Sequence, residues 1–332
     1  MNSAPMLTDA VTVRSAGIDD ASTLLDLHRA GFDSDWTMAD WRHRYVDNLD
    51  GGPSIVGAFT SEGVCVAAFC GVLMPAKFGG KVRLACRGGD VAVHPDLRKT
   101  AAGPKLLLRV CSTYANSLSG GEVGAIFGFP QPGLLRTLVR HCRYEVMADV
   151  MWLMKPVSEH GQPSSELQTS IAETVPDDSA AFLHECMEQV DAGVVRNLNY
   201  LRWRYERNPR GSYVTATVRS RSGTLTGLAI LRREELEDGA LLINEWLVRR
   251  GDANSRQALL GAVESLARQL GRKNVVTSFA VSSPEFGEMQ ELHGFHVAPA
   301  PYQFTVRPYS STITRSYMFH NWLHTPGDLD FT

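Results

Sequence analysis

The sequence lacks both a long hydrophobic run and any regular spacing of cysteines. Its apolar run at 64–74 is interrupted by Gly71 and is shorter than the ~20 residues that a membrane helix needs. The six cysteines occur without a C-x-x-C pair or a paired-histidine spacing, which argues against a zinc site and against a disulfide framework. We therefore expect no metal site, no membrane span and six buried free thiols.

The first ten residues also lack the basic region and following apolar stretch of a secretion signal. This absence predicts a cytoplasmic protein without a membrane partner. The chain has 332 residues, of which 44% are hydrophobic and 21% charged. Because one core usually serves roughly 150 residues, these values indicate a globular chain of two domains.

Lysine and arginine are absent between Pro156 and Val195, where every charged residue is acidic. The next stretch, 196–221, holds seven arginines and the single acid Glu206, with aromatic residues between them. Such a strip favours ion pairing with the acidic segment before it, and it also suits phosphates and bases. The net charge of −3 gives no global attraction to nucleic acid.

An internal repeat is the most informative feature of the sequence. The pattern R-Y-x-x-N-x-x-G occurs at 44–51 and again 160 positions later at 204–211. Gly63 and Gly223 keep this offset, and each separates two strand-like runs that predict a β-hairpin. The runs cover 55–59 and 64–72 in the first copy, and 213–218 and 225–231 in the second.

The repeat continues through the rest of each copy. Leu107-Leu108 and Leu259-Leu260 match at an offset of 152, on segments whose apolar spacing predicts amphipathic helices. The copies also end alike, at 141–146 and 292–297. We therefore predict an α/β protein with two tandem domains, 1–157 and 170–332, joined by a linker within 156–169. Each domain should hold a mixed, mostly antiparallel sheet flanked by helices.

The paired R-Y-x-x-N-x-x-G motifs are interpreted as architectural, because they occur in both copies. The arginine should bridge a helix end to a carboxylate, and the tyrosine should pack beneath the hairpin. Asn and Gly suit the turn into the first strand.

One segment of the first copy has the features of a ligand-binding loop. The run at 90–95 predicts a strand that ends at Pro95, and a helix should follow over 106–118. Pro104 suits the first turn of that helix, where its missing N–H is not needed.

The motif D-V-A-V-H-P-D-L-R-x-x-A-x-G, at 90–103, resembles the acyl-CoA signature of the GNAT family of N-acyltransferases. In that signature small residues let backbone N–H groups approach a pyrophosphate at a helix N-terminus. The resemblance covers residues 11–155 and implies acetyl-CoA or another acyl-CoA as cofactor. The residues that it implies for cofactor binding are Val91, Val93, Arg98, Lys99, Thr100, Ala101, Ala102, Gly103 and Pro104.

Ala101 stands where the family more often has glycine, so its backbone must keep a negative φ. The equivalent loop of the second copy, 249–255, has neither the spaced small residues nor the usual arginine. That copy is therefore expected to have a structural or substrate-shaping role. Family members often donate a proton to the thiolate from a tyrosine, and Val139 occupies that position here.

Asp90 is the candidate base or amine-binding carboxylate, since it lies three residues before Val93 on the cofactor-side strand. The alternative is a solvent-facing residue or a cap at the strand edge. His94 ends the same strand and is a second catalytic candidate. Glu245 occupies the corresponding place in the second copy and is a candidate substrate contact.

Three functions follow from these features. The first is transfer of an acyl group, acetyl above all, from an acyl-CoA to a primary amine of a small molecule or sugar by direct attack. The second is aminoacyl transfer from charged tRNA, as in the Fem-type transferases, whose layout also pairs two GNAT-like domains. In it Arg202, Arg204, Arg207 and Arg210 would contact the tRNA. The third is a binding protein without catalysis. The aromatic C-terminal run, 317–332, should dock on the protein.

Overall fold

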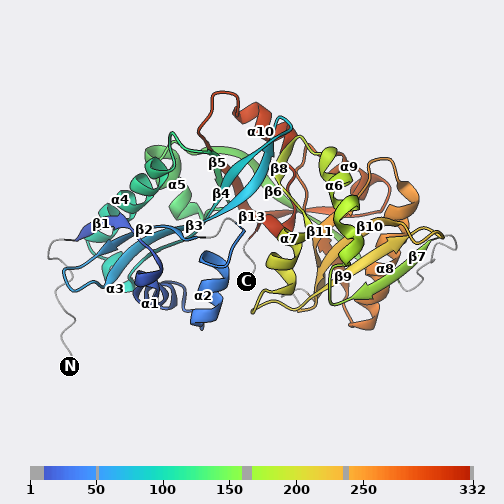
Figure 1. The fold of residues 1–332 in the computed structure, drawn as a ribbon, viewed down its shortest axis with the longest axis horizontal. Helices are drawn as coiled ribbons and strands as arrows, with labels where there is room; N and C mark the ends of the chain where they lie inside the picture. Colours follow the sequence, from blue (N-terminus) through green and yellow to red (C-terminus); the bar gives the residue numbers. More distant parts are fainter. Residues whose placement is uncertain (1–10, 50–51, 159–166, 235–238, 330–332) are drawn as a thin grey trace. The chain divides into compact units, whose positions relative to one another are not determined.

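The computed structural model describes residues 11–49, 52–158, 167–234 and 239–329. The first ten residues, Gly51 of the repeat and most of the predicted linker lie outside these ranges. The chain forms two compact units, each drawn from several parts of the sequence (Figure 1). The first unit consists of Met1–Pro75, Arg83–Val146 and Phe304–Thr314, and the second of Ala76–Val82, Met147–Gln303 and Arg315–Thr332.

The first unit contains a sheet in the order β1-β2-β3-β4-β5-β13. Strands β1, β2 and β3 pair antiparallel, whereas β4 and β5 pair parallel, as expected for strands joined through a helix. The strands are β1 (Thr12–Ser15), β2 (Ser54–Phe59), β3 (Cys65–Phe78), β4 (Lys81–Val93), β5 (Val123–Gly128) and the end of β13 (His296–Pro308). The helices are α1 (Ala21–Phe32), α2 (Met38–Tyr45), α3 (Pro95–Arg98), α4 (Ala102–Ser117) and α5 (Pro132–His141).

The second unit repeats this arrangement in the order β13-β6-β12-β11-β10-β9-β7, with β11 and β12 parallel. A short strand, β8 (Ala192–Val194), pairs with the end of β3. The other strands are β6 (Glu145–Pro156), β7 (Gln168–Ala172), β9 (Tyr213–Arg219), β10 (Leu225–Arg232), β11 (Ala240–Val248) and β12 (Asn274–Thr277). The helices are α6 (Ala180–Glu188), α7 (Leu198–Leu201) with the π-turn Arg202–Glu206, α8 (Ala253–Gln269), α9 (Pro284–Glu291), α10 (Arg315–Asn321) and the turn Pro326–Asp328.

The two copies exchange their closing strands. Strand β6 ends the first copy, yet its residues Leu153 to Pro156 pair with β12 of the second copy. Strand β13 ends the second copy, and its residues Thr305 to Pro308 pair with β5 of the first. Each compact unit therefore includes a closing strand that belongs, in sequence, to the other copy.

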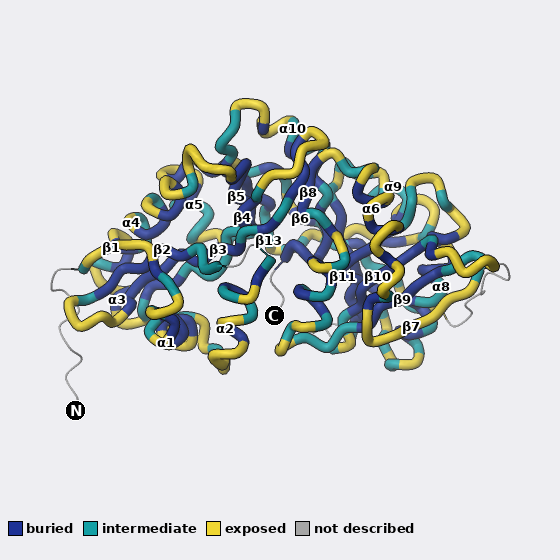
Figure 2. The backbone as a smooth tube through the Cα atoms, viewed as in Figure 1, coloured by how far each residue is buried: buried dark blue, intermediate teal, exposed yellow. Residues whose placement is uncertain are grey.

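The longest helix of each unit packs on its sheet through a buried stripe. Leu106, Val110 and Tyr114 recur every four residues along α4 and join the core of the first unit. Ala115 on α4 and Ala267 on α8, matched at the repeat offset, are both fully buried. Figure 2 shows the buried strands of both units and the helices with one exposed side. The predicted hairpins and amphipathic helices are confirmed.

All six cysteines are free and buried, as predicted. Burial raises the pKa of Cys65, Cys86 and Cys186 to about 12, so these thiols stay protonated at neutral pH. Within the described ranges no cluster of three or more potential metal ligands occurs. No helix in those ranges combines the length and apolarity required to cross a membrane.

Candidate active site

Strands β4 and β5 separate at the position where the sequence predicts the cofactor, and we call this separation the fork. The parallel ladder of β4 and β5 ends at the pair Arg87 and Phe127, although β4 continues to Val93. A Cβ on Gly128 would lie 2.8 Å from the carbonyl oxygen of Gly88, so the strands part at a close backbone approach. The second half of β4 is thus left without β5 on that edge.

The backbone of β4 beyond the fork presents polar groups to the open edge. The N–H of His94 donates to the carbonyl of Val66 on β3 at 2.8 Å. Because the hydrogen-bonding direction alternates along a strand, the backbone N–H groups and carbonyls of Val91 and Val93 point to the opposite edge of β4. The carbonyl of Val93 accepts from Arg98 Nε at 2.8 Å. The N–H groups of both valines therefore face the fork.

The predicted loop connects this strand to α4. Ala101, just before the helix, has φ −64° and ψ −18°, so the negative φ that alanine requires at this position is present. Lys99, Thr100 and Ala101 are exposed, and Ala102 begins the helix with its N–H on Thr100 Oγ1 at 3.3 Å. The first four N–H positions of a helix have no partner within it. Small exposed residues at such an end suit a phosphate group.

Two residues of the signature hold the loop in place through contacts within the chain. The guanidinium of Arg98 donates to the carbonyls of Val93 and Gly31, which ties the loop to β4 and α1. A Cβ on Gly103 would collide with the carbonyl oxygen of Leu97. Both residues therefore maintain the shape of the loop, and Pro104 beside them is exposed.

Asp90 lies on β4 beyond the fork and joins a buried cluster. Its Oδ2 accepts from Arg44 Nη1 at 2.8 Å and from the Tyr45 hydroxyl, and His28 Nε2 lies 3.9 Å from it. Every contact recorded for this carboxylate within the described ranges falls on Oδ2, and the side chain is 12% exposed. The Oδ1 atom is therefore the oxygen that can accept from a ligand.

The R-Y-x-x-N motif supports this cluster. Thr37 and Asp40 form a capping box at the start of α2, and Asn48 Nδ2 donates to the carbonyl of Tyr45 at 3.1 Å at its end. Burial and the negative charge of Asp90 raise the pKa of Tyr45 well above its usual value, so the phenol remains a donor. The predicted contact of the motif's arginine with a carboxylate is confirmed, and its tyrosine donates to the same carboxylate.

An aromatic wall that the sequence patterns above do not predict lies beside Asp90. The ring of His28 stacks on Trp36 with centroids 4.1 Å apart, and Phe32 lies 4.8 Å from the same ring. His28 Nδ1 is 2.9 Å from Ser34 Oγ. The signal that was available is the position of His28, four residues after Leu24 on the buried stripe of α1.

His94 has a local role in the structure. Its Nδ1 accepts from the N–H of Asp96 at 3.4 Å at the start of α3, and the Asp96 carboxylate is 3.7 Å from the same nitrogen. These contacts describe a helix cap.

The second copy forms the same fork, at an offset of 155. The ladder of β11 and β12 ends at Leu242 and Val276, and β11 continues to Val248. Glu245 stands where β4 has Asp90, but its side chain is 0% exposed. Its Oε1 accepts from Tyr205 at 2.8 Å and from Tyr200 at 3.3 Å. Its Oε2 accepts from Thr325 at 2.8 Å and from Arg196 at 3.3 Å, so both oxygens are engaged within the chain.

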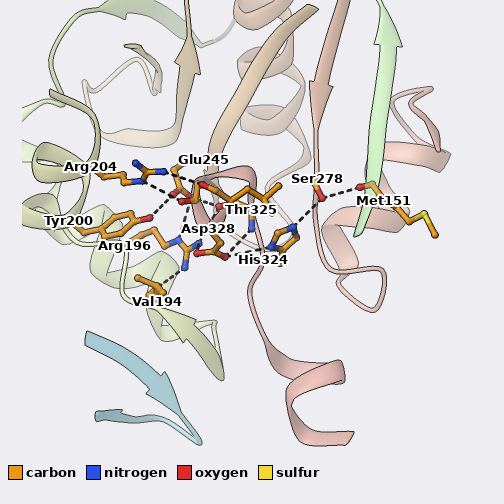
Figure 3. A network of polar contacts seen from close by, with 12 residues as sticks. Met151, Val194, Arg196, Tyr200, Arg204, Glu245, Ser278, His324, Thr325 and Asp328 are labelled. Carbon is orange, nitrogen blue, oxygen red and sulfur yellow. Dashed lines mark hydrogen bonds and ion pairs between the residues drawn. The ribbon is translucent and has the colours of Figure 1, made fainter. Parts of the chain in front are cut away.

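The C-terminal segment, residues 322–329, closes this second site (Figure 3). Arg196 Nη2 donates to Asp328 Oδ1 at 2.7 Å, and Arg204 Nη2 to the carbonyl of Leu329 at 3.1 Å. A Cβ on Gly327 would collide with the Glu245 carboxylate and the Tyr205 hydroxyl. The predicted docking of the C-terminal run is confirmed for the described residues, and Glu245 serves to hold it.

Burial raises the pKa of Asp328, but the charge of Arg196, its hydrogen bond and the nearby His324 outweigh this effect, so the pKa of Asp328 is lowered. Burial lowers the pKa of Arg196, but the negative charges of Asp328 and Glu245 outweigh this effect, so the pKa of Arg196 is raised. The cluster is therefore a buried set of fixed charges.

The arginine-rich strip is mostly occupied inside the second unit. Arg202 pairs with Asp177, and Arg219 forms two bonds of 2.8 Å with Asp178. Arg204 holds the C-terminal segment, whereas Arg207 and Arg210 lie exposed. The ion-paired interpretation of the strip is confirmed for the arginines that pair with the preceding acidic segment.

In both copies a forked sheet carries a carboxylate that accepts a hydrogen bond from the tyrosine of the helix with the Arg-Tyr pair, which we call the R-Y helix. No protein-family model matches the sequence, and neither does any curated protein. Solved structures do resemble it. One is a probable N-acyltransferase from Enterococcus faecalis, with a TM-score of 0.68 and 15% identity over 90% of this chain and 73% of the other.

A tandem GNAT protein from the clavulanic acid biosynthesis pathway matches with a TM-score of 0.55 and 14% identity, over 91% of this chain and 99% of its own. N-myristoyltransferase from Saccharomyces cerevisiae, solved with myristoyl-CoA bound, matches with a TM-score of 0.56 and 11% identity, over 93% and 81%. The chain therefore has the tandem GNAT fold that the repeat and the motif at 90–103 together predicted.

Proposed function

We propose that the first copy transfers an acyl group, acetyl above all, from an acyl-CoA to a primary amine of a small molecule or sugar. The observation that carries this proposal is the fork of β4 and β5, which brings the open edge of β4, the exposed start of α4 and the Asp90 carboxylate into one copy. Neighbours named as N-acyltransferases support the class of reaction.

The residues present fit a CoA thioester. The N–H groups of Val91 and Val93 would hold its extended arm along the open strand edge, and the loop from Lys99 to Pro104 would take the pyrophosphate. Arg98 and Gly103 support the loop from within. When bound, the thioester supplies an activated carbonyl carbon.

Asp90 binds and deprotonates the acceptor in this proposal. Its Oδ1 accepts a hydrogen bond from the amine while Arg44 and Tyr45 fix Oδ2. The nitrogen then forms a bond to the carbonyl carbon, the C–S bond breaks, and the amine proton passes to Asp90 directly or through water. Strand N–H groups stabilise the negative charge on the carbonyl oxygen.

The thiolate receives its proton from solvent, because the position of the usual tyrosine holds Val139, which is 40% exposed on α5. The aromatic wall of His28 and Trp36 would lie against the carbon skeleton of the acceptor.

Release of free thiol from acetyl-CoA in the presence of a panel of small and sugar amines tests the proposal. We expect saturable acetyl-CoA binding by calorimetry and an amine-dependent release of thiol. Longer acyl-CoAs serve as a second arm that identifies the acyl group. If no acyl-CoA binds and no amine promotes release, the proposal is wrong.

A further inference from the structure

The second unit contains a cavity that the acyl transfer described above does not use. Its volume is about 130 Å³, and it lies among the end of β11, the start of α9 and the end of α10. The residues that bear on its chemistry are Val190, Trp246, Arg256, Pro284, Trp322 and Leu323.

The repeat places this cavity at the counterpart of the proposed donor site. Trp246–Val248 correspond to 91–93 at the offset of 155, and Pro284 corresponds to Pro132 at the offset of 152. Arg256 likewise stands at the position of Pro104. Two large donor side chains thus replace small residues, and the cavity differs from a slot for an extended thioester.

Two buried donors on its lining lack hydrogen-bond partners within the described ranges. Trp246 is 5% exposed and its indole Nε1 has none. Arg256 is also 5% exposed, and its Nε has none, although its Nη1 lies 2.7 Å from Glu288 Oε2. Buried donors without acceptors are costly, so a ligand that brings acceptor oxygens would be favoured.

The remaining walls limit the size and charge of such a ligand. At about 130 Å³ the cavity is large enough for several water molecules or one small organic ligand. Val190, Val248 and Leu323 supply apolar surface, and the charged residues on the lining balance, with Arg250 and Arg256 against Asp191 and Glu285. A short carboxylate fits these conditions better than a phosphate dianion, because one ionised group meets two donors without a net positive field.

We propose that this cavity binds a short-chain carboxylate, whose oxygens accept hydrogen bonds from Trp246 Nε1 and Arg256 Nε. The C-terminal segment forms one wall through Trp322 and Leu323, and Leu323 N–H is bonded to the carbonyl of Ala192 at 2.7 Å. The ligand therefore binds only the docked form of this segment and stabilises it by mass action.

Saturation-transfer NMR on the full chain with sodium propionate tests this site. We expect saturable binding that Trp246→Phe weakens about tenfold, equivalent to ~1.4 kcal/mol, because the ring remains and the donor is lost. Trp152→Phe removes a tryptophan elsewhere in the same unit and should leave binding unchanged. Propionamide should bind more weakly than propionate, and propylamine should not compete.

A second readout follows the C-terminal segment. Propionate should slow its removal by carboxypeptidase in the native chain and in Trp152→Phe, but not in Trp246→Phe. Absence of saturable binding, equal binding by Trp246→Phe, or displacement of propionate by propylamine would each overturn the proposal. These outcomes are independent of acetyl-CoA turnover, so they distinguish this site from the acyltransferase function.

Discussion

The carboxylate on the long strand is open to a ligand in the first copy and sealed in the second. Asp90 and Glu245 both accept a hydrogen bond from the tyrosine of an R-Y helix. Position 36 in the first copy is Trp, and its repeat counterpart is Arg196, which binds Glu245 and Asp328. In the second copy Arg196 and the C-terminal segment together form a closed network of charges, where the first copy has an aromatic wall beside a half-free carboxylate.

The two copies share the strands and the helix that surround the carboxylate, but only the first copy leaves that carboxylate accessible to a ligand. Both forks and both R-Y helices persist, because they build the sheets. In the second copy Glu245 binds the chain's own C-terminal segment. In the first copy Asp90 Oδ1 can accept a hydrogen bond from a ligand.

The largest expected effect is on the closed network. Arg196→Met should lower the free energy of unfolding by about 3–5 kcal/mol, because it leaves Glu245 and Asp328 buried without their cation. Urea denaturation measures this loss. Arg44→Met is the matched change in the first copy, and its loss should be smaller since Asp90 is partly exposed. Equal losses would remove the distinction between the two sites.

Next in size is the effect on catalysis. Asp90→Asn should reduce kcat/KM about 100-fold, the lower end for loss of a general base, while acetyl-CoA binding is retained. Steady-state thiol release measures the rate. Asp96→Asn alters an exposed carboxylate on the neighbouring loop and should leave the rate within about twofold. A rate for Asp90→Asn that matches the native one would assign Asp90 to structure alone.

Some of the features behind these two predictions can be predicted from the sequence, and others cannot. The hairpins, α4 and the loop are local, so glycine spacing, apolar period and small residues near Ala101 sufficed to predict them. The contact of Arg44 with Asp90 joins residues 46 apart in the sequence, and the repeat predicted only that a carboxylate would be bound. Apolar spacing places His28 on the buried face of α1, but no local pattern identifies Trp36 or pairs either ring with Asp90, because that depends on which helix face meets β4.

A smaller effect concerns pH. Asp328→Asn should cost about 2 kcal/mol at neutral pH, since a charged hydrogen-bond acceptor is lost. The folded pKa of Asp328 is lowered, so its stabilisation is full above the unfolded pKa of about 3.9 and is lost as the pH falls through the folded pKa. Denaturation curves of variant and native protein should therefore converge in acid. A difference that stays constant with pH would contradict the charge assignment.

The smallest effect is expected at the loop. Ala101→Gly should leave the KM for acetyl-CoA within about twofold and cost about 0.5–1 kcal/mol of stability, because alanine already has a helical φ here. Gly103→Ala should raise KM and lower stability together, since its Cβ would collide with Leu97. Thermal unfolding and KM measured on both variants give the result. A large gain in affinity from Ala101→Gly would show that the alanine distorts the loop.

The exchanged strands bear on how the chain folds and why it keeps a copy without a donor loop. Thr305 bonds to Gly128 across 177 residues, so the sheet of the first copy stays incomplete on the ribosome until almost the whole chain has emerged. Contacts of such long range form slowly, since a large loop must close before they can stabilise anything. Deleting either copy would remove a strand from the other. Each copy is therefore needed to complete the sheet of the other, whatever its own loop binds.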